Sequence, residues 1–297
     1  SMGPLIKTNM TRCIHCTRCV RFSTEVAGVN DLGALGRGEG MEITTYLENS
    51  IDSELSACVI DLCPVGALTS KPYAFNARPW ELSHTETVDV MDAIGSNIRV
   101  DTKGNQVLRV LPRLNEDINE EWISDKTRYA IDGLKNQRLD KPYVRNENGS
   151  LEETDWDTAF NKIKDNIDKI KPNEIACLLG DLVDVEAAYA AKVLFQKLNV
   201  DNIDCRIDGA EIGEHGRAGY IFNSQINGID EADALLIFGS NPRLEAPVLN
   251  ARIRKRYLQG NFPISLIGEN NNLTYPVNYL GSKSIDIEKL RDKKNKF

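Results

Sequence analysis

The chain has 297 residues, of which 41% are hydrophobic and 27% charged, and it carries a formal net charge of -8. This length is enough for two domains with real hydrophobic cores, and the negative charge argues against an electrostatic grip on nucleic acid or on anionic lipid. No apolar run approaches the ~18 residues of a transmembrane helix, so we expect no direct membrane insertion, and any membrane role would depend on partners.

The cysteines are unevenly distributed along the sequence. The chain does not open with a basic segment followed by an apolar core, so no export signal is visible. In such a chain we expect cysteines to be metal ligands or buried thiols rather than partners in disulfides. Cys177 and Cys205 lie inside apolar, strand-like runs, where we expect them in the core. The other five crowd the N-terminal end of the chain: Cys13, Cys16, Cys19, Cys58 and Cys63.

The run 10–22 places three cysteines two residues apart each time. Bacterial ferredoxins carry two runs of C-x2-C-x2-C-x3-C-P, and each cluster takes its fourth thiolate from the Cys-Pro of the other run. Here Ser23 stands where the first run would have its Cys-Pro cysteine, and the second run keeps only Cys63, followed by Pro64. What remains is one complete set of ligands for a single [4Fe-4S] cluster: Cys13, Cys16, Cys19 and Cys63.

The alternative to the cluster is a zinc-bound or metal-free structural module. Zinc also binds C-x2-C pairs, although it normally uses two separated pairs rather than three thiols in a row and one distant thiol. Cys58 fits neither ferredoxin run, and we interpret it as a small buried hydrophobic residue. Three arginines accompany the motif and are candidates for offsetting the negative charge of a cluster: Arg12, Arg18 and Arg21.

The sequence pattern changes after Pro79. Residues 97–112 contain two β-rich runs around Gly104 and predict a hairpin. Farther on, the pattern predicts helices over 156–170, 185–198 and 246–260, and strands over 174–180, 202–208, 232–239 and 263–268. This alternation predicts parallel sheets covered by helices. Gly180 and Gly239 end two of these strands without a phosphate-binding motif, so we interpret them as turn residues.

Several separated blocks resemble a known family, in the order in which they occur there: residues 10–22, 35–43, 59–75, 78–82, 119–145 and 239–255. They resemble the largest iron-sulfur subunit of respiratory complex I, NADH:quinone oxidoreductase. In that family the four matching cysteines hold one [4Fe-4S] centre of the electron path from flavin to quinone. The family also has an upstream [2Fe-2S] domain and a His/Cys cluster site, so we expect this sequence to be part of a longer subunit.

The region after Trp80 resembles the molybdopterin oxidoreductase fold. Members that keep an extra cluster there have four cysteines, and this sequence has other residues at the matching positions: Asp89, Asp92, Ser96 and Ser124. We interpret the two carboxylates as solvated loop residues rather than a metal pair. Catalytic members also place a metal-ligating cysteine or selenocysteine shortly after an N-x-D-C segment, and the sequence offers none beyond Cys205, so no molybdopterin is expected.

The resemblance implies an α+β ferredoxin-like [4Fe-4S] domain followed by an α/β molybdopterin-oxidoreductase-like domain with parallel sheets. We place the ferredoxin-like domain at 1–78, a β-rich segment at 79–150 and a Rossmann-like scaffold at 151–297.

The implied function is a single-electron relay between the flavin and quinone sites of the NADH:quinone oxidoreductase translocase, with no complete active site in this chain. The implied partners are other peripheral-arm subunits, including the flavin-bearing one. The implied location is the cytoplasmic face of the bacterial inner membrane or the matrix face of the mitochondrial inner membrane, reached through those partners.

Overall fold

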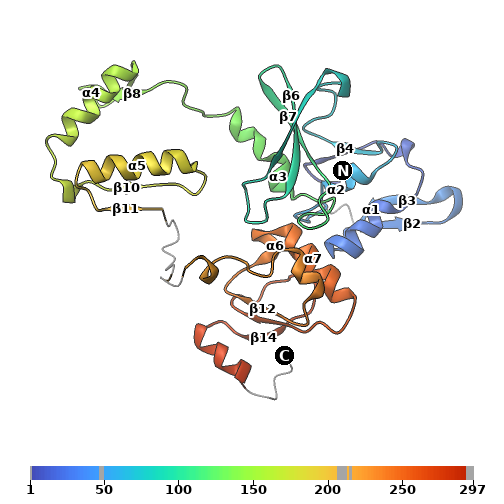
Figure 1. Cartoon of the computed structure of the whole chain (residues 1–297). Helices are drawn as coiled ribbons and strands as arrows, with labels where there is room; N and C mark the ends of the chain where they lie inside the picture. Colours follow the sequence, from blue (N-terminus) through green and yellow to red (C-terminus); the bar gives the residue numbers. More distant parts are fainter. Residues whose placement is uncertain (1, 47–49, 206–212, 214–215, 292–297) are drawn as a thin grey trace. The chain divides into compact units, whose positions relative to one another are not determined.

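The structure is a computed structural model that describes residues 2–46, 50–205, 213 and 216–291. The chain divides into two compact units. Unit 1 combines residues 1–134 with 222–297, and unit 2 consists of residues 135–221. The colours of Figure 1 follow the chain, so that unit 1 runs from blue to green and resumes in orange and red.

The N-terminal part of unit 1 holds two small antiparallel sheets. Strand β1 (Ile6–Thr8) pairs with β4 (Leu68–Ser70), and β2 (Leu32–Leu35) pairs with β3 (Glu42–Thr45). Short helical segments connect them: η1 (Met10–Arg12), α1 (Arg18–Arg21), the π-helix η2 (Phe22–Ala27), η3 (Gly38–Gly40) and α2 (Cys58–Leu62). Because β1 leads into the three-cysteine run and β4 follows Cys63, their pairing brings the two cysteine segments to one place.

An antiparallel three-stranded sheet follows, with the order β5 (Ser83–Val88), β6 (Asn97–Lys103) and β7 (Gln106–Pro112). The predicted hairpin at 97–112 is confirmed, and Gly104 has a φ of 58° in its turn, where glycine is free of strain. Strand β5 was not predicted, because all six of its side chains are exposed and no apolar alternation marks it. Helix α3 (Asp125–Tyr129) and the 3-10 helix η6 (Ala130–Leu134) complete this part.

The C-terminal part of unit 1 contains a parallel three-stranded sheet, β12 (Leu235–Phe238), β13 (Ile264–Ile267) and β14 (Asn278–Gly281). Its helical segments are η9 (Asn227–Glu231), α6 (Pro242–Glu245), α7 (Pro247–Leu258) and η10 (Ser284–Arg291). The predicted strands at 232–239 and 263–268 and the helix at 246–260 are found with shorter ends. Strand β14 was not predicted: Pro276 precedes it, and of its four residues only Leu280 is buried.

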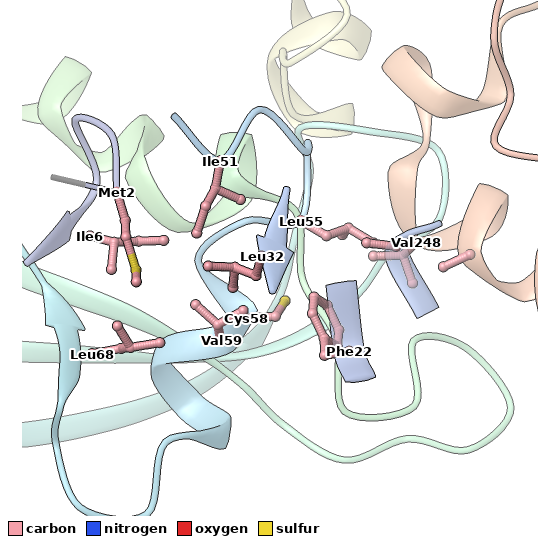
Figure 2. Close-up of a cluster of buried hydrophobic side chains, with 12 residues drawn as sticks. Met2, Ile6, Phe22, Leu32, Ile51, Leu55, Cys58, Val59, Leu68 and Val248 are labelled. Carbon is pink, nitrogen blue, oxygen red and sulfur yellow. The ribbon is translucent and has the colours of Figure 1, made fainter. Parts of the chain in front are cut away.

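The core of unit 1 joins segments that are distant in sequence. Side chains from β1, η2, β2, α2 and β4 pack together, and Val248 and Ala251 of α7 belong to the same cluster (Figure 2). Burying one large aliphatic or aromatic side chain stabilises a fold by roughly 1.5–3 kcal/mol. Shared burial therefore explains why residues 222–297 form one compact unit with the N-terminal part.

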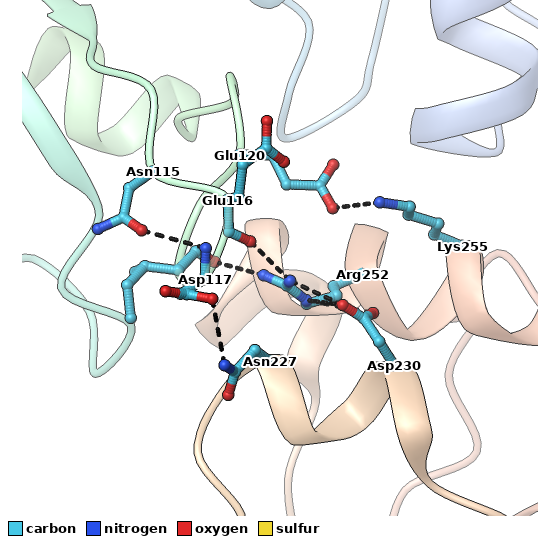
Figure 3. A network of polar contacts seen from close by, with 9 residues as sticks. Asn115, Glu116, Asp117, Glu120, Asn227, Asp230, Arg252 and Lys255 are labelled. Atoms are coloured by element: carbon cyan, nitrogen blue, oxygen red, sulfur yellow. Dashed lines mark hydrogen bonds and ion pairs between the residues drawn. The ribbon is translucent and has the colours of Figure 1, made fainter.

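Polar contacts reinforce this junction between α7 and the segment that follows β7 (Figure 3). The Arg252 guanidinium is buried; it donates to the backbone carbonyl of Glu116 at 2.7 Å and pairs with Asp230 at 2.8 Å. One turn later, Lys255 Nζ lies 2.6 Å from a carboxylate oxygen of Glu120. A buried guanidinium with these partners is satisfied by the fold itself.

The described residues of unit 2 form two separate strand pairs and two longer helices. Strand β8 (Tyr143–Arg145) pairs antiparallel with β9 (Leu151–Glu153), and β10 (Cys177–Leu178) pairs parallel with β11 (Ile203–Asp204). Helices α4 (Trp156–Ile167) and α5 (Val185–Lys197) begin after aspartate N-caps, and the short η7 (Pro172–Glu174) and η8 (Arg217–Gly219) complete the unit. The predicted parallel pairing is present between β10 and β11, but these two strands pair over two residues only.

The expectation that Cys177 and Cys205 lie in the core is wrong for Cys205, which is exposed, while Cys177 is half-buried. Cys205 directly follows the last paired residue of β11, and among the described residues no strand pairs with it. The residues after Cys205, 206–210, where catalytic members would place a molybdenum ligand, lie outside the described residues. Within the part of the chain that is described, no helix has the length and apolar character needed to span a membrane.

Candidate metal centre

One pocket of unit 1 is lined by all four predicted ligand residues, Cys13, Cys16, Cys19 and Cys63. Cys13 directly follows η1, Cys19 lies in α1, and Cys63 caps the C-terminal end of α2. Most of the remaining lining is apolar: Met10, Ile14, Ile43, Pro64, Val65, Ala67 and Leu68. The thiols therefore surround a space that is largely shielded from polar groups.

The backbone between these cysteines is held in an unusual conformation. His15 and Thr17 have φ angles of 53° and 57°, in the left-handed region that non-glycine residues seldom adopt. Gly66, shortly after Cys63, has a φ of 65°. Such residues cost of order 1 kcal/mol or more each and cluster at functional sites, where the surrounding structure maintains them. Here His15 lies between Cys13 and Cys16, and Thr17 lies between Cys16 and Cys19.

Backbone amides of the same loops point at sulfur. The His15 N–H donates to Cys13 Sγ at 3.4 Å, and the Leu68 N–H donates to Cys63 Sγ, also at 3.4 Å. Burial raises the pKa of the Cys19 thiol, and the neighbouring Cys16 and Cys13 act in the same direction. Because its ionisation is opposed in this way, the Cys19 thiol becomes a stable thiolate only with a compensating cation, such as bound iron.

This donor set fits an iron-sulfur cube better than a single ion. In the described residues, no three His, Cys, Asp or Glu side chains are close enough to hold one metal ion. A zinc ion needs all of its thiolates at about 2.3 Å, whereas a [4Fe-4S] cluster takes one thiolate at each of its irons. Four cysteines lining one pocket, with backbone amides facing two of the sulfurs, fit the ligand requirements of such a cluster.

Two further predictions concern residues beside the motif. Cys58 is 1% exposed and belongs to the hydrophobic core, which confirms its interpretation as a small buried residue. Burial raises the pKa of its thiol to about 12, so it stays protonated at neutral pH. Of the three arginines proposed to offset cluster charge, Arg18 lines the pocket, while Arg21 pairs with Glu25 at 3.1 Å on the surface.

The second set of family ligand positions forms a hydrogen-bonded network. Asp89 is 5% exposed and accepts a hydrogen bond from Thr127 Oγ1 at 2.8 Å. Ser124 Oγ lies 2.8 Å from the same Thr127 oxygen, and the Asp89 N–H donates to the Ser96 carbonyl at 2.8 Å. The interpretation of Asp89 as a solvated carboxylate is therefore wrong: the side chain is buried and acts as an acceptor in a network that ties β5 to α3.

Asp92, at the remaining position of that set, is half-buried. Its Oδ1 accepts the Ile94 N–H at 3.0 Å, while among the described residues its Oδ2 has no hydrogen-bond partner. Burial raises the pKa of this carboxyl, and the charge of Asp89 raises it further. A carboxylate that is disfavoured in its charged form, beside a second one, is a poor substitute for a thiolate ligand.

Sequence reasoning missed the contacts that hold α2, which carries Cys63 at its end. Asp61 of α2 pairs with the buried Arg128 of α3. Asp125 of α3 accepts hydrogen bonds from Ser56 and Ala57, which precede α2. The only signal in the sequence was that Asp125 and Arg128 fall within the family-like block 119–145.

Family comparisons divide the chain into three successive regions. Residues 3–69 match the NADH-quinone oxidoreductase subunit 3 ferredoxin-like domain, and residues 82–132 match the NADH-ubiquinone oxidoreductase NDSU1/NuoG-like 4Fe-4S domain. Residues 138–296, more than half of the chain, match molybdopterin oxidoreductase. The chain belongs to the molybdopterin oxidoreductase family. A ferredoxin-like domain followed by a molybdopterin oxidoreductase domain was predicted, whereas the separate match of residues 82–132 to a 4Fe-4S domain was not.

Curated relatives confirm the resemblance inferred from the sequence blocks. The chain is 54% identical to the mitochondrial NADH-ubiquinone oxidoreductase 78 kDa subunit of Candida albicans, over 97% of this chain and 40% of that protein. It is 51% identical to an NADH-quinone oxidoreductase subunit of Rickettsia bellii, over 100% of this chain and 43% of that protein. The 75 kDa subunit of NADH-ubiquinone oxidoreductase from Reclinomonas americana is also 51% identical, over 100% of this chain and 45% of that protein. The chain thus spans less than half the length of these relatives.

Proposed function

We propose that this chain is an electron relay within NADH:quinone oxidoreductase and that it binds one [4Fe-4S] cluster through four cysteines: Cys13, Cys16, Cys19 and Cys63. The observation that carries the proposal is the single pocket lined by all four thiols. When bound, such a cluster takes up and releases one electron at a time. The chain's own contribution is to hold four thiolates around one space with a mostly apolar lining and to direct two amides at sulfur.

The rest of the chain serves, in this proposal, as a scaffold without a complete active site. Residues 1–78 form the ferredoxin-like α+β domain, 79–150 a β-rich segment and 151–297 an α/β domain that binds no molybdopterin. The matching position for an extra cluster lacks thiols, because Asp89, Asp92 and Ser124 replace three of the family cysteines. The relatives' names place those proteins in NADH-quinone or NADH-ubiquinone oxidoreductase. We infer that the partners are other peripheral-arm subunits, including the flavin-bearing one, and that the location is peripheral to the bacterial inner or mitochondrial inner membrane, on its cytoplasmic or matrix face.

The proposal is tested by anaerobic reconstitution of the chain with iron and sulfide. Iron and acid-labile sulfide per chain are measured, and an EPR spectrum is recorded after dithionite reduction. We expect about four irons and the signal of a reduced [4Fe-4S] cluster, both lost or altered in Cys63→Ser. Cys205→Ser is the matched control, because that thiol is exposed and does not line the pocket. Stoichiometric zinc without iron, unaffected by reduction, would instead identify a structural module.

A further inference from the structure

Helix α2 carries Cys63 at its C-terminal end and is held by a different region of unit 1. The Cys63 N–H donates to the carbonyl of Val59, so the orientation of this cysteine follows that of the helix. α2 packs against α1 and β4, and it also forms hydrogen bonds with α3 and the segment leading into it, which belong to residues 82–132. This is the region that matches a 4Fe-4S family model and contains no cysteine.

The first contact lies at the start of α2. Asp125 accepts a hydrogen bond from Ser56 Oγ at 2.5 Å and one from the Ala57 N–H at 2.8 Å. Its own N–H donates to the Glu54 carbonyl at 2.8 Å. Asp125 thus accepts two hydrogen bonds and donates one, and together they fix the turn that precedes the helix.

The second contact lies in the hydrophobic core. Cys58 is the first residue of α2, and its thiol donates a hydrogen bond to the Ile123 carbonyl oxygen at 3.2 Å. Ile123 has no exposed surface, and Cys58 lies among the core side chains shown in Figure 2. Rotation of α2 would therefore disturb a closely packed region.

The third contact lies in the last turn of the helix, two residues before Cys63. Arg128 of α3 donates to both carboxylate oxygens of Asp61, at 2.5 and 3.2 Å. The Arg128 side chain is 5% exposed, and the Asp61 side chain is 26% exposed. A guanidinium fork that meets a carboxylate with two bonds fixes direction as well as distance, which a single ammonium cannot do.

We propose that Arg128 is a positioning residue for the cluster, and that the cysteine-free region 82–132 contributes to electron transfer by holding α2. The inference rests on the proposed function, because it assumes that Cys63 is a ligand. By fixing Asp61, Arg128 keeps the last turn of α2, and with it Cys63, in one orientation. Its positive charge also balances the Asp61 carboxylate near the cluster, where an unbalanced negative charge would oppose the uptake of an electron.

The test compares four forms of the 297-residue chain with wild type. Arg128→Met removes the charge and the fork, and Arg128→Lys keeps the charge without the fork. The double variant Asp61→Asn/Arg128→Met removes the pair without leaving a buried charge alone, and so protects the test against simple misfolding. Arg109→Met is the matched control, since Arg109 pairs with the buried Asp101 in the same region and no contact joins it to α2 among the described residues.

Two sets of measurements are made. Hydrogen exchange of the α2 amides in the metal-free chain reports on the helix alone. Iron release to a chelator, the EPR spectrum after reduction and the midpoint potential report on the reconstituted cluster. We expect faster exchange in α2 and about tenfold faster iron release in Arg128→Met and in the double variant, with Arg109→Met like wild type. The midpoint potential falls in Arg128→Met and returns toward the wild-type value in Arg128→Lys and in the double variant, because both restore the charge balance.

The outcomes separate this inference from the proposed function. If wild type binds no iron, the proposed function fails, while the exchange data still decide whether Arg128 holds α2. If wild type binds the cluster but the Arg128 variants keep its potential, its EPR spectrum and its rate of iron release, the positioning role is wrong and the relay stands. Equal changes in Arg109→Met would show a general loss of stability and would also overturn the inference.

Discussion

Residues 3–69 and 82–132 match two family models of related description, a ferredoxin-like domain and a 4Fe-4S domain, and they use the corresponding positions differently. In the first region four thiols surround one pocket. In the second, the side chains of Asp89, Thr127 and Ser124 form hydrogen bonds that connect the end of β5 to α3. A fold of this kind can therefore keep its shape when a network of side chains takes over the connections that metal ligands would provide.

The largest expected difference between the two regions is in iron binding, and substitution of a cysteine in the first region tests it. Cys16→Ser should lower the iron content of the reconstituted chain from about four to about three or fewer, with a changed EPR spectrum, because one corner of the cluster loses its thiolate. The control is Cys205→Ser, since both cysteines are exposed and only Cys16 lines the pocket. Unchanged iron in Cys16→Ser would remove the contrast between the regions.

The next effect is a pH dependence of stability that arises from Asp125, whose carboxylate accepts hydrogen bonds from Ser56 and Ala57 of the first region. Burial raises the pKa of its carboxyl to about 6, although hydrogen bonds from Ser56 and Ala57 oppose this shift. The folded chain therefore holds this proton more tightly than the unfolded chain. Its stabilising contribution is complete below pH ~4, is lost as pH rises toward about 6, and amounts to about 3 kcal/mol at most.

Urea unfolding of the metal-free chain at several pH values measures this contribution. A Trp156→Phe background restricts the tryptophan signal to unit 1. The difference in free energy of unfolding between wild type and Asp125→Asn should change across pH 4–6 and stay constant above that window. A difference that is the same at pH 4.5 and pH 7.5 would mean that Asp125 is ionised throughout.

A smaller loss is expected when the network of the second region is opened at Asp89. Asp89→Ala leaves the buried Thr127 hydroxyl and the Met91 N–H without their acceptor, so the free energy of unfolding should fall by about 1–3 kcal/mol. The same urea experiment at pH 7.5 measures it. Thr85→Ala is a suitable control, because Thr85 is exposed on β5 in the same sheet. No loss in Asp89→Ala would show that the network does not stabilise the region.

The sequence predicted the first region better than the second, for a physical reason. Ligand spacing such as Cys13, Cys16 and Cys19 is a short-range property, because two intervening residues suffice to turn the chain. The same holds for the hairpin at 97–112, which is marked by its own turn. No local sequence pattern indicates that Asp89 is buried, because its hydrogen-bond partner Thr127 lies 38 residues away. Whether a loop carboxylate is solvated or buried depends on that distant element.

The contacts of α2 illustrate the same limit. Asp61 and Arg128 are 67 residues apart, and Ser56 and Asp125 are 69 apart. Charged residues at such separations show no periodicity, so a single sequence does not indicate which ones meet. Strand β5 was missed because its side chains are exposed, whereas helices α4, α5 and α7 were found because 3.6-residue periodicity and N-terminal signals are local.

The smallest expected effect decides whether the carboxylates of the second region act as metal ligands at all. Burial raises the pKa of Asp92, and Asp89 raises it further, so its charged form is mildly disfavoured in the folded chain. Asp92→Asn keeps an oxygen for the Ile94 N–H and removes the repulsion, and it should leave the free energy of unfolding unchanged or raise it by up to about 1 kcal/mol at pH 7.5. If the two carboxylates held a cation, the substitution would instead destabilise the chain, and the loss would grow when a divalent metal is added to wild type. The sign of this small change therefore distinguishes a hydrogen-bonded replacement of a metal site from a metal site with altered ligands.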